Sequence, residues 1–452
     1  MADLHPVHPA AAAGTCSPFP DLDAYRSVVF QLINDPDGFW LSAAARLAWD
    51  EAPETAKGSD GDWFADGRLN ANESCLDRDL FTHGDRLAIS WKGEKGHRTV
   101  TLQALFEQVG TFASGLKMLG IHSGGRVALL MGSIPEMVVA SLACARIGAT
   151  WMPIAPFTRA DVLREQLDAF KPIAVVTQDE ARIPGRTVPT KTILDQALKA
   201  DGHSVQFVIV TPHTGGAAGW KMGRDIWWEH SIMGASSFCP AAAMPATAQQ
   251  LVLTEDGGMS GHAIGSLLTW ASWSQAVVMD VRPGRMVACL HPLHTLEGQA
   301  LGILATLANG GTIALSELST AAGLPAGIDT LLGDPAGLSP PPRIAVFEGG
   351  VPASDWRARS AELPEGALVG ALSHSGGFCL AAFPPALPGG PDLLGLALPG
   401  HRALLLDSDG AVLRGPAEGR LVIEIDRPGT QGTLDTGRTC SRDRNGFFTV
   451  TA

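Results

Sequence analysis

The most constraining feature of this sequence is a regular alternation of apolar runs and helical patterns between residues 126 and 177. Three short apolar runs have the composition of buried strands: 126–131, 151–154 and 173–177. The two segments between them, 136–147 and 161–170, have the apolar spacing of helices. Short links and a strict strand–helix order indicate parallel strands covered by helices. We therefore expect an α/β fold.

The flanking segments extend this pattern. Thr101 is expected to cap a helix over 102–119 that stops at Gly120. Residues 395–425 contain short strand patterns separated by Asp-Gly and Gly turns, which is typical of an antiparallel β unit. The remaining expectations are a leader over 1–22, helical spacing over 23–50, irregular structure over 61–79, a further strand over 205–211 and a loose crossover over 316–342. We divide the chain into an α/β core over 23–394 and a β subdomain over 395–452.

Composition excludes several classes of protein. The chain has 452 residues, of which 45% are hydrophobic, so it can bury a large core. Its net charge of −13 argues against nucleic acid or an anionic membrane as the main partner. No uncharged apolar run reaches the roughly 18 residues of a membrane span, and the N-terminus lacks the pattern of a signal peptide. Seven scattered cysteines predict free thiols in a reducing cytoplasm.

The segment from Leu251 to Gly265 poses a contradiction. A strand pattern over 251–253 runs into a glycine-rich loop, and such loops cradle phosphates because their backbone N–H groups can approach an anion. The loop carries Glu255 and Asp256 and contains no Lys or Arg. Two carboxylates repel a triphosphate. The strand followed by a glycine-rich loop is the layout of a nucleotide-binding site, but the negative charges of the loop do not suit a nucleotide.

Several segments together resemble acetyl-CoA synthetases of the adenylate-forming superfamily. WFADGRLNANESCLDRD resembles the family's WF-x-G-G-x-LN-x-x-x-NC-x-DRH signature, and the Asp35–Trp40 stretch resembles its DP-x-x-FW start. Further resembling stretches occur in the family's order: GGRVALLMGSIPEMVVASLACARIGA, PLHTLEGQALGILATLANGGT, GLALPGHRALLLDSDG and GPAEGRLVIEIDRPG. The resemblance implies the family's large N-terminal domain, with two helix-covered sheets and a small antiparallel β subdomain.

The resemblance also implies a chemistry whose residues can be compared one by one. The family joins ATP and a carboxylate into an acyl-adenylate, which CoA then attacks. Its phosphate loop, close to YTSGSTGKPKG, matches residues 253–263, where Ser260 and His262 stand in place of the lysines. We expect an acidic loop kept for its turn geometry; the alternative is residual anion binding by Thr254, Gly257, Gly258 and Ser260.

The other nucleotide-binding motifs have also lost residues that bind ATP or Mg²⁺ in the family. The family's WWQTETGG, which serves the α-phosphate and Mg²⁺, matches 371–377, where Ser373 can still donate a hydrogen bond. His374 replaces the metal-binding Glu, and imidazole is a poor ligand for Mg²⁺, so we expect no metal site. The adenine-facing GEP matches Glu348–Gly350, with Trp356 keeping the register. Arg438 stands where the family has an Asp that accepts hydrogen bonds from the ribose hydroxyls. A guanidinium can only donate hydrogen bonds, so it cannot replace that Asp.

The CoA side is changed as well. The family's FGGFS, whose glycines approach the CoA adenine, matches residues 154–158, where Pro156 removes an N–H. A phosphate-binding Arg of the family matches Glu165, with Arg164 one position away. The sequence ends at Ala452, where the family continues into a mobile C-terminal domain with a catalytic lysine. We therefore expect that lid domain to be absent.

These observations lead to one favoured function and two alternatives. We expect an acetyl-CoA synthetase-like pseudoenzyme that binds no cofactor, neither ATP with Mg²⁺ nor CoA, and has no catalytic residue. It would act in the cytoplasm as a scaffold or a regulatory partner of another protein, as a homo- or hetero-oligomer. The alternatives are a sensor that binds a nucleotide or an acyl-CoA, and an atypical AMP-forming ligase. Thr254, Gly257, Gly258, Ser260, Ser373 and Arg438 mark the degenerate nucleotide site.

Overall fold

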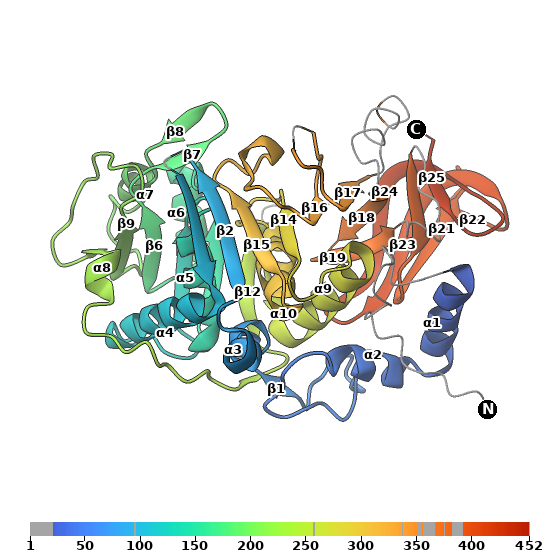
Figure 1. Cartoon of the computed structure of the whole chain (residues 1–452), viewed down its shortest axis with the longest axis horizontal. Helices are drawn as coiled ribbons and strands as arrows, with labels where there is room; N and C mark the ends of the chain where they lie inside the picture. Colours follow the sequence, from blue (N-terminus) through green and yellow to red (C-terminus); the bar gives the residue numbers. More distant parts are fainter. Residues whose placement is uncertain are drawn as a thin grey trace.

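The computed structural model describes residues 21–94, 96–255, 258–336, 338–349, 355, 367–374, 376–381 and 392–451 (Figure 1). Residues 1–20 of the expected leader lie outside this range, as do Asp256, Gly257, Gly350 and Trp356. The described chain forms two large β-sheets with helices packed between and around them. None of the described helices has the length and hydrophobicity to cross a membrane.

The first sheet has seven strands in the order β10-β9-β6-β4-β5-β12-β13. Its strands are β4 (Arg126–Leu130), β5 (Thr150–Ile154), β6 (Ala174–Gln178), β9 (Phe207–Thr211), β10 (Asp225–Trp227), β12 (Gln249–Glu255) and β13 (Gly258–Ala263). All neighbours are parallel except β12 and β13, which form an antiparallel hairpin. The alternation expected over 126–177 is therefore confirmed.

Three helices on this sheet begin and end within one residue of the predicted bounds: α4 (Leu102–Met118), α5 (Pro135–Arg146) and α6 (Ala160–Phe170). Helix α7 (Thr190–Ala197) and the short α8 (Trp228–Ser231) were not predicted. The Thr101 hydroxyl accepts from the N–H of Ala104 at 3.2 Å, which caps α4. Gly120, just beyond α4, has a φ of +81°, a conformation that a glycine adopts without strain.

The second sheet has fourteen strands and extends farther than expected. Its order is β22-β21-β23-β24-β25-β20-β19-β18-β17-β16-β14-β15-β2-β3. One part consists of β2 (Leu87–Gly93), β3 (Gly96–Thr101), β14 (Met286–Cys289), β15 (Thr312–Ser316), β16 (Thr330–Leu332), β17 (Ile344–Glu348), β18 (Ala367–His374) and β19 (Gly377–Ala381). The six strands from β2 to β18 are parallel neighbours. The segment expected as a loose crossover thus contributes β16 to the sheet.

The antiparallel β unit expected over 395–425 is confirmed, and it is continuous with the second sheet. It contains β20 (Leu393–Ala397), β21 (His401–Leu406), β22 (Val412–Leu413), β23 (Ala417–Arg427), β24 (Thr430–Arg442) and β25 (Phe448–Val450). Strand β20 pairs with β19 on one side and with β25 on the other. Backbone hydrogen bonds therefore join the β unit to the α/β core.

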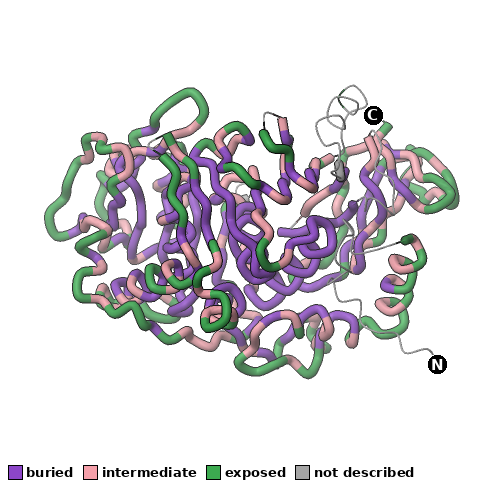
Figure 2. The backbone as a smooth tube through the Cα atoms, in the orientation of Figure 1, coloured by how far each residue is buried: buried purple, intermediate pink, exposed green. Residues whose placement is uncertain are grey.

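A central helix, α9 (Ile264–Met279), connects the two sheets. Every one of its residues is buried, and Figure 2 shows it as a coil surrounded by other elements. It contacts β12 and β13 of the first sheet and β17 and β19 of the second, and it packs on the π-helix Gly298–Ala305. Helix α10 (Thr306–Ala308) and a 3₁₀ turn, Ala321–Gly323, follow.

The helical spacing expected over 23–50 is confirmed in its first part, and the structure adds helices after residue 72 that the sequence did not indicate. Helices α1 (Leu22–Asn34) and α2 (Pro36–Ala44) meet at Asp35, whose carboxylate caps α2 by accepting from the N–H of Gly38. The irregular structure expected over 61–79 is wrong in part, because Glu73–Asp77 forms a π-helix and Arg78–His83 forms α3. Short strands complete the structure: β1 (Arg68–Leu69) with β11 (Met244–Pro245), and β7 (Ala181–Ile183) with β8 (Arg186–Val188).

Buried asparagines explain why this segment is ordered. Asn70 donates to the carbonyl oxygens of Ala145 and Ala242, each at 2.8 Å, and Asn72 donates to that of Leu142 at 2.9 Å. These bonds tie the signature segment to the C-terminal end of α5. Turn-forming residues thus serve long-range contacts here, which local composition does not reveal.

The buried Arg146 guanidinium links α5 to the signature segment and supplies a test of the fold. Arg146 is 2% exposed and makes two 3.0 Å bonds to the carboxylate of Asp77. We expect Arg146→Met to lower the free energy of unfolding by about 3 kcal/mol, because it leaves a mostly buried carboxylate unpaired. Arg159→Met, which breaks an exposed pair with Asp161, should leave stability unchanged. Chemical denaturation followed by circular dichroism measures both; equal curves for the two variants would contradict this role.

Candidate functional site

The glycine-rich segment is a β-hairpin, and this corrects the expectation of an open loop. Residues 249–255 form β12 and residues 258–263 form β13, with Thr254 opposite Met259 and Leu253 opposite Ser260. Thr254 and Gly258 are exposed, and Ser260 is half-buried. Ladder pairing uses backbone N–H groups that a phosphate cradle would offer to an anion. Gly257 lies outside the described residues.

His262, which stands at a lysine position of the family motif, contributes no positive charge to this hairpin. Burial lowers its pKa to about 4, so the imidazole is neutral at physiological pH. Its Nε2 atom is buried and has no hydrogen-bond partner in the described part of the chain. The hairpin therefore holds none of the cationic groups that neutralise a triphosphate.

A second set of candidate residues meets at the end of β17. The Ser373 hydroxyl donates to the Oε1 atom of Glu348, and the Oε2 atom of Glu348 lies 2.9 Å from the Nε2 atom of His291. Burial opposes protonation of His291, but the hydrogen bond and charge of Glu348 outweigh it, and the pKa of His291 is raised. Ser373 and Glu348 are thus engaged with neighbouring side chains.

Arg438 lies against the same end of β17. Its Nη1 atom donates to the carbonyl oxygen of Gly349 at 3.3 Å. Gly349 has a φ of +83°, and a Cβ atom at this position would lie 2.5 Å from the Nη2 atom of Arg438. The guanidinium therefore covers the backbone of Gly349. The nearby Asp435 carboxylate accepts from Arg420.

The candidate residues form two separate groups. Ser373 and Arg438 converge on the neighbouring residues Glu348 and Gly349, as described above. Among the described residues, no hydrogen bond or ion pair joins this group to Thr254, Gly258 or Ser260 on the hairpin. The structure thus brings together two of the six candidates at one strand end and places three on the other sheet.

His374 lies beside the guanidinium of Arg427. Its carbonyl oxygen accepts from the Nη2 atom of Arg427 at 3.0 Å, and burial together with the Arg427 charge lowers the pKa of its imidazole. In the portion of the chain that is described, no three His, Cys, Asp or Glu side chains are grouped to hold a metal.

The segment that resembles a CoA-binding loop forms a tight turn after β5. The hydroxyl of Thr158 donates to the carbonyl oxygen of Ala155 at 2.8 Å, and Phe157 is 45% exposed. Arg164, one position from the family's phosphate-binding arginine, is already engaged: it pairs with Asp168 at 2.6 Å and donates to the carbonyl of Ala200 at 2.8 Å. Arg164 is therefore held on its own helix and the adjoining loop.

A cation that sequence analysis did not single out lies beside this turn. A cavity of about 540 Å³ is lined by Phe157 and Arg159 from the turn and by Arg186 from β8. Arg159 pairs with Asp161 at 2.5 Å, whereas Arg186 is exposed and makes no ion pair with any described residue. Arg186 is on a short hairpin whose position next to residue 157 is set by the fold, so sequence spacing did not indicate it.

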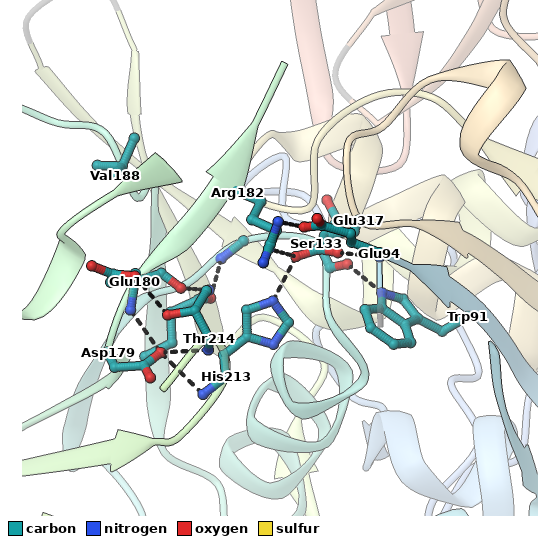
Figure 3. A network of polar contacts seen from close by, with 12 residues as sticks. Trp91, Glu94, Ser133, Asp179, Glu180, Arg182, Val188, His213, Thr214 and Glu317 are labelled. Atoms are coloured by element: carbon teal, nitrogen blue, oxygen red, sulfur yellow. Dashed lines mark hydrogen bonds and ion pairs between the residues drawn. The ribbon is translucent and has the colours of Figure 1, made fainter. Parts of the chain in front are cut away.

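Beside the same hairpin, a polar network joins the two sheets (Figure 3). Glu317, which is 6% exposed, lies 2.6 Å from the Nε2 atom of His213 and 3.6 Å from Arg182. Arg182 also pairs with Glu94, and the backbone N–H of Glu94 donates to Glu317 at 3.0 Å. The network borders a mainly apolar cavity of about 450 Å³.

Comparison with known proteins identifies the family. Residues 25–75 match the family model "Acetyl-coenzyme A synthetase N-terminus", and residues 76–248 match "AMP-binding enzyme". The chain is 29% identical to acetyl-coenzyme A synthetase of Methylocella silvestris, over 98% of this chain and 79% of that protein. It is 35% identical to acetyl-coenzyme A synthetase 1 of Pseudomonas aeruginosa, over 70% of this chain and 50% of that protein. The chain belongs to the acetyl-CoA synthetase family.

A solved relative shows the same fold across the chain. The structure of acetoacetyl-CoA synthetase from Streptomyces lividans superimposes with a TM-score of 0.80 over 94% of this chain and 74% of that one, at 19% identity. The expected fold class, an α/β domain like the N-terminal domain of this family, is therefore confirmed. The match to the Pseudomonas synthetase spans half of that protein's length.

The His291–Glu348 pair makes a pH dependence testable. Because folding raises the pKa of His291 above 6.5, the stability gained from its protonation is fully present below about pH 6.5 and is lost as pH rises through the folded pKa. We expect the difference in unfolding free energy between wild type and His291→Gln to shrink from pH 6 to pH 9. Urea denaturation at each pH measures it. A difference that grows with pH would show that the pKa of His291 is not raised.

Proposed function

We propose that this member of the acetyl-CoA synthetase family is a pseudoenzyme, which forms no acyl-adenylate and serves as a scaffold or regulatory partner of another protein. The observation that carries the proposal is the pairing at the end of β17. Arg438 binds the carbonyl oxygen of Gly349, and Glu348 binds both Ser373 and His291. The groups at the nucleotide position thus interact with one another.

Electrostatics supports the same proposal. An ATP-binding site needs donors and cations to neutralise its phosphates. The hairpin carries Glu255 and Asp256 in sequence and holds a neutral imidazole at His262. Replacing the family's ribose-binding carboxylate with Arg438 removes an acceptor for two hydroxyl groups. We propose on these grounds that the protein uses no ATP, Mg²⁺ or CoA as a cofactor.

The scaffold role also requires a protein partner and a cellular compartment. We propose a protein partner in the cytoplasm, either a second copy of this chain or a different chain. Six of the seven cysteines are described, all as free thiols, which agrees with a reducing compartment. The excess of acidic residues argues against nucleic acid as that partner.

Titration calorimetry tests the proposal most directly. We expect no heat from Mg-ATP or AMP up to millimolar concentrations, and no acetate-dependent exchange between ATP and pyrophosphate. The physical reason is that the family's phosphate and ribose partners are replaced or already paired. Binding of AMP with a millimolar or tighter Kd would exclude a pure scaffold. Exchange activity would instead establish the atypical ligase.

A CoA- or acyl-CoA-binding sensor is the second candidate function, and one observation favours it. The cavity at Phe157 lies beside the segment that resembles the family's CoA loop, and Arg186 in its wall makes no ion pair with any described residue. A phosphate group is a suitable counterion for an exposed guanidinium, which can bind it through two hydrogen bonds.

Replacing Arg186 distinguishes the sensor from the scaffold. If the protein is a sensor, wild type binds CoA and Arg186→Ala binds it about tenfold more weakly, because a charge-assisted contact is lost. Arg402→Ala is the matched control, since it removes an exposed arginine that pairs with Glu424 on the β unit. Calorimetry with CoA measures all three proteins. If wild type gives no heat, or Arg186→Ala binds as tightly as wild type, this candidate is excluded.

A further inference from the structure

A mostly apolar cavity lies between the N-terminal helices and the β unit. Its volume of about 690 Å³ is within the range of roughly 300–1,000 Å³ that is typical of small-molecule sites. The lining comes from α1, α2, the side chains of Ala56, Lys57 and Trp63, the end of β20 with the turn after it, β21 and β23. The hydroxyl of Tyr25 on α1 donates to the carbonyl oxygen of Ala397 at 2.6 Å, which fixes α1 against the β unit (Figure 1).

Two indole rings and one face of α1 make this wall suitable for an aromatic ligand. Trp40 is 1% exposed and Trp63 is 8% exposed, and their rings meet edge to face with centroids 5.8 Å apart. Val29, Leu32 and Ile33 lie on one face of α1 and add aliphatic surface. Aromatic rings bury a large apolar area against such surfaces and pair favourably with the edges and faces of indoles.

The acidic and basic side chains of the wall are already engaged, which disfavours a charged ligand. Arg402 donates to the carboxylate of Glu424 at 2.6 Å, and the Nζ atom of Lys57 donates to that of Asp426 at 2.8 Å. Asp37 accepts from a backbone N–H at 2.8 Å. An anion that enters the cavity therefore meets more carboxylates than cations, and both of these cations have a counterion.

Two buried nitrogen atoms of lining residues are donors without an acceptor. The Nε1 atom of Trp63 and the Nδ1 atom of His401 make no hydrogen bond within the described part of the chain. The Nε2 atom of His401 accepts from the Nε atom of Arg427 at 3.3 Å, so the ring proton is on Nδ1. Burial lowers the pKa of His401 to about 3, and it outweighs the nearby backbone of Leu398 and Pro399, which favours protonation; the ring is neutral at pH 7. A buried donor without a partner is costly, and a ligand acceptor removes that cost.

We propose that this cavity binds an uncharged aromatic molecule that carries an oxygen acceptor. Its ring would pack between the apolar face of α1 and the indoles of Trp40 and Trp63, and its oxygen would accept from the Nε1 atom of Trp63. The volume, the aromatic wall, the paired charges and the unpaired donors all favour this class.

This site is separate from the positions that match the family's nucleotide and CoA motifs. Its lining contains no residue of β17, of the β12–β13 hairpin or of the turn at Phe157. ATP, CoA and carboxylates are anions, whereas the proposed ligand is uncharged. The proposal therefore stands or falls independently of the pseudoenzyme function.

Calorimetry at pH 7 with three probes that share one ring system tests the ligand class. The probes are 2-naphthol, which is uncharged, the anion 2-naphthoate and the cation 2-naphthylmethylammonium. We expect saturable binding of 2-naphthol to wild type, and binding of each charged probe about tenfold weaker or less, because a charge loses hydration in a wall whose own charges are paired.

Substitutions in the wall locate the bound probe. Ile33→Ala removes aliphatic contact and should weaken 2-naphthol binding about threefold; Ile33 is 72% exposed, so the fold should persist. Phe30→Ala is the matched control, since Phe30 is 59% exposed on the same helix and does not line the cavity. Trp63→Phe removes the N–H donor and should weaken 2-naphthol about fivefold more than it weakens naphthalene, which has no oxygen.

Each remaining outcome overturns the proposal. A charged probe that binds as tightly as 2-naphthol would exclude the uncharged class. Equal 2-naphthol affinity in wild type and Ile33→Ala would place the probe outside this cavity, and equal losses of 2-naphthol and naphthalene in Trp63→Phe would exclude the hydrogen bond to Trp63. Absence of 2-naphthol binding by wild type up to millimolar concentrations would exclude the site. Thermal unfolding of each variant, measured alongside, shows whether a loss of binding reflects a loss of fold.

Discussion

The structure depends on one buried helix. All sixteen residues of α9 are shielded from water, and the helix touches strands of both sheets. In such a position polar groups depend on partners inside the protein. Gln275 donates to the carbonyl of Leu301 at 2.7 Å, and Asn309 donates to the carbonyl of Ser272 at 2.9 Å. The two sheets, the hairpin before α9 and the strand β19 beside it are therefore positioned by the same set of contacts.

This arrangement explains how residues at the ligand positions can change while the fold of the family is kept. The hairpin is held by pairing to β5 and by its continuation into α9, neither of which involves the side chains of Thr254 or Ser260. Residues that contact a ligand contribute little to core packing, so their replacement leaves the free energy of folding nearly unchanged. The chain keeps the architecture of its family. At the end of β17, Arg438 and Glu348 bind protein groups.

Periodicity predicted most of the elements, because helix and strand spacing depend on neighbours along the chain. The parallel strands over 126–177, the α4 helix with its Thr101 cap and the antiparallel unit after residue 395 were predicted in this way. The hairpin at 249–263 was missed because its glycines indicate a loop equally well. The π-helix at Glu73–Asp77 was missed because the bonds of Asn70 and Asn72 that order it reach residues far along the chain.

The sequence by itself determined the fold class, the family and the identities of the residues at each motif, since these follow from spacing and residue type. It also showed that Arg438 replaces an acceptor with a donor. Only the tertiary structure decided what these residues contact. Arg438 lies on Gly349, eighty-nine positions away along the chain, and Arg427 lies on Trp270 at the wall of a cavity. Contacts of this kind depend on how the sheets and α9 pack together, and no local pattern in the sequence encodes that packing.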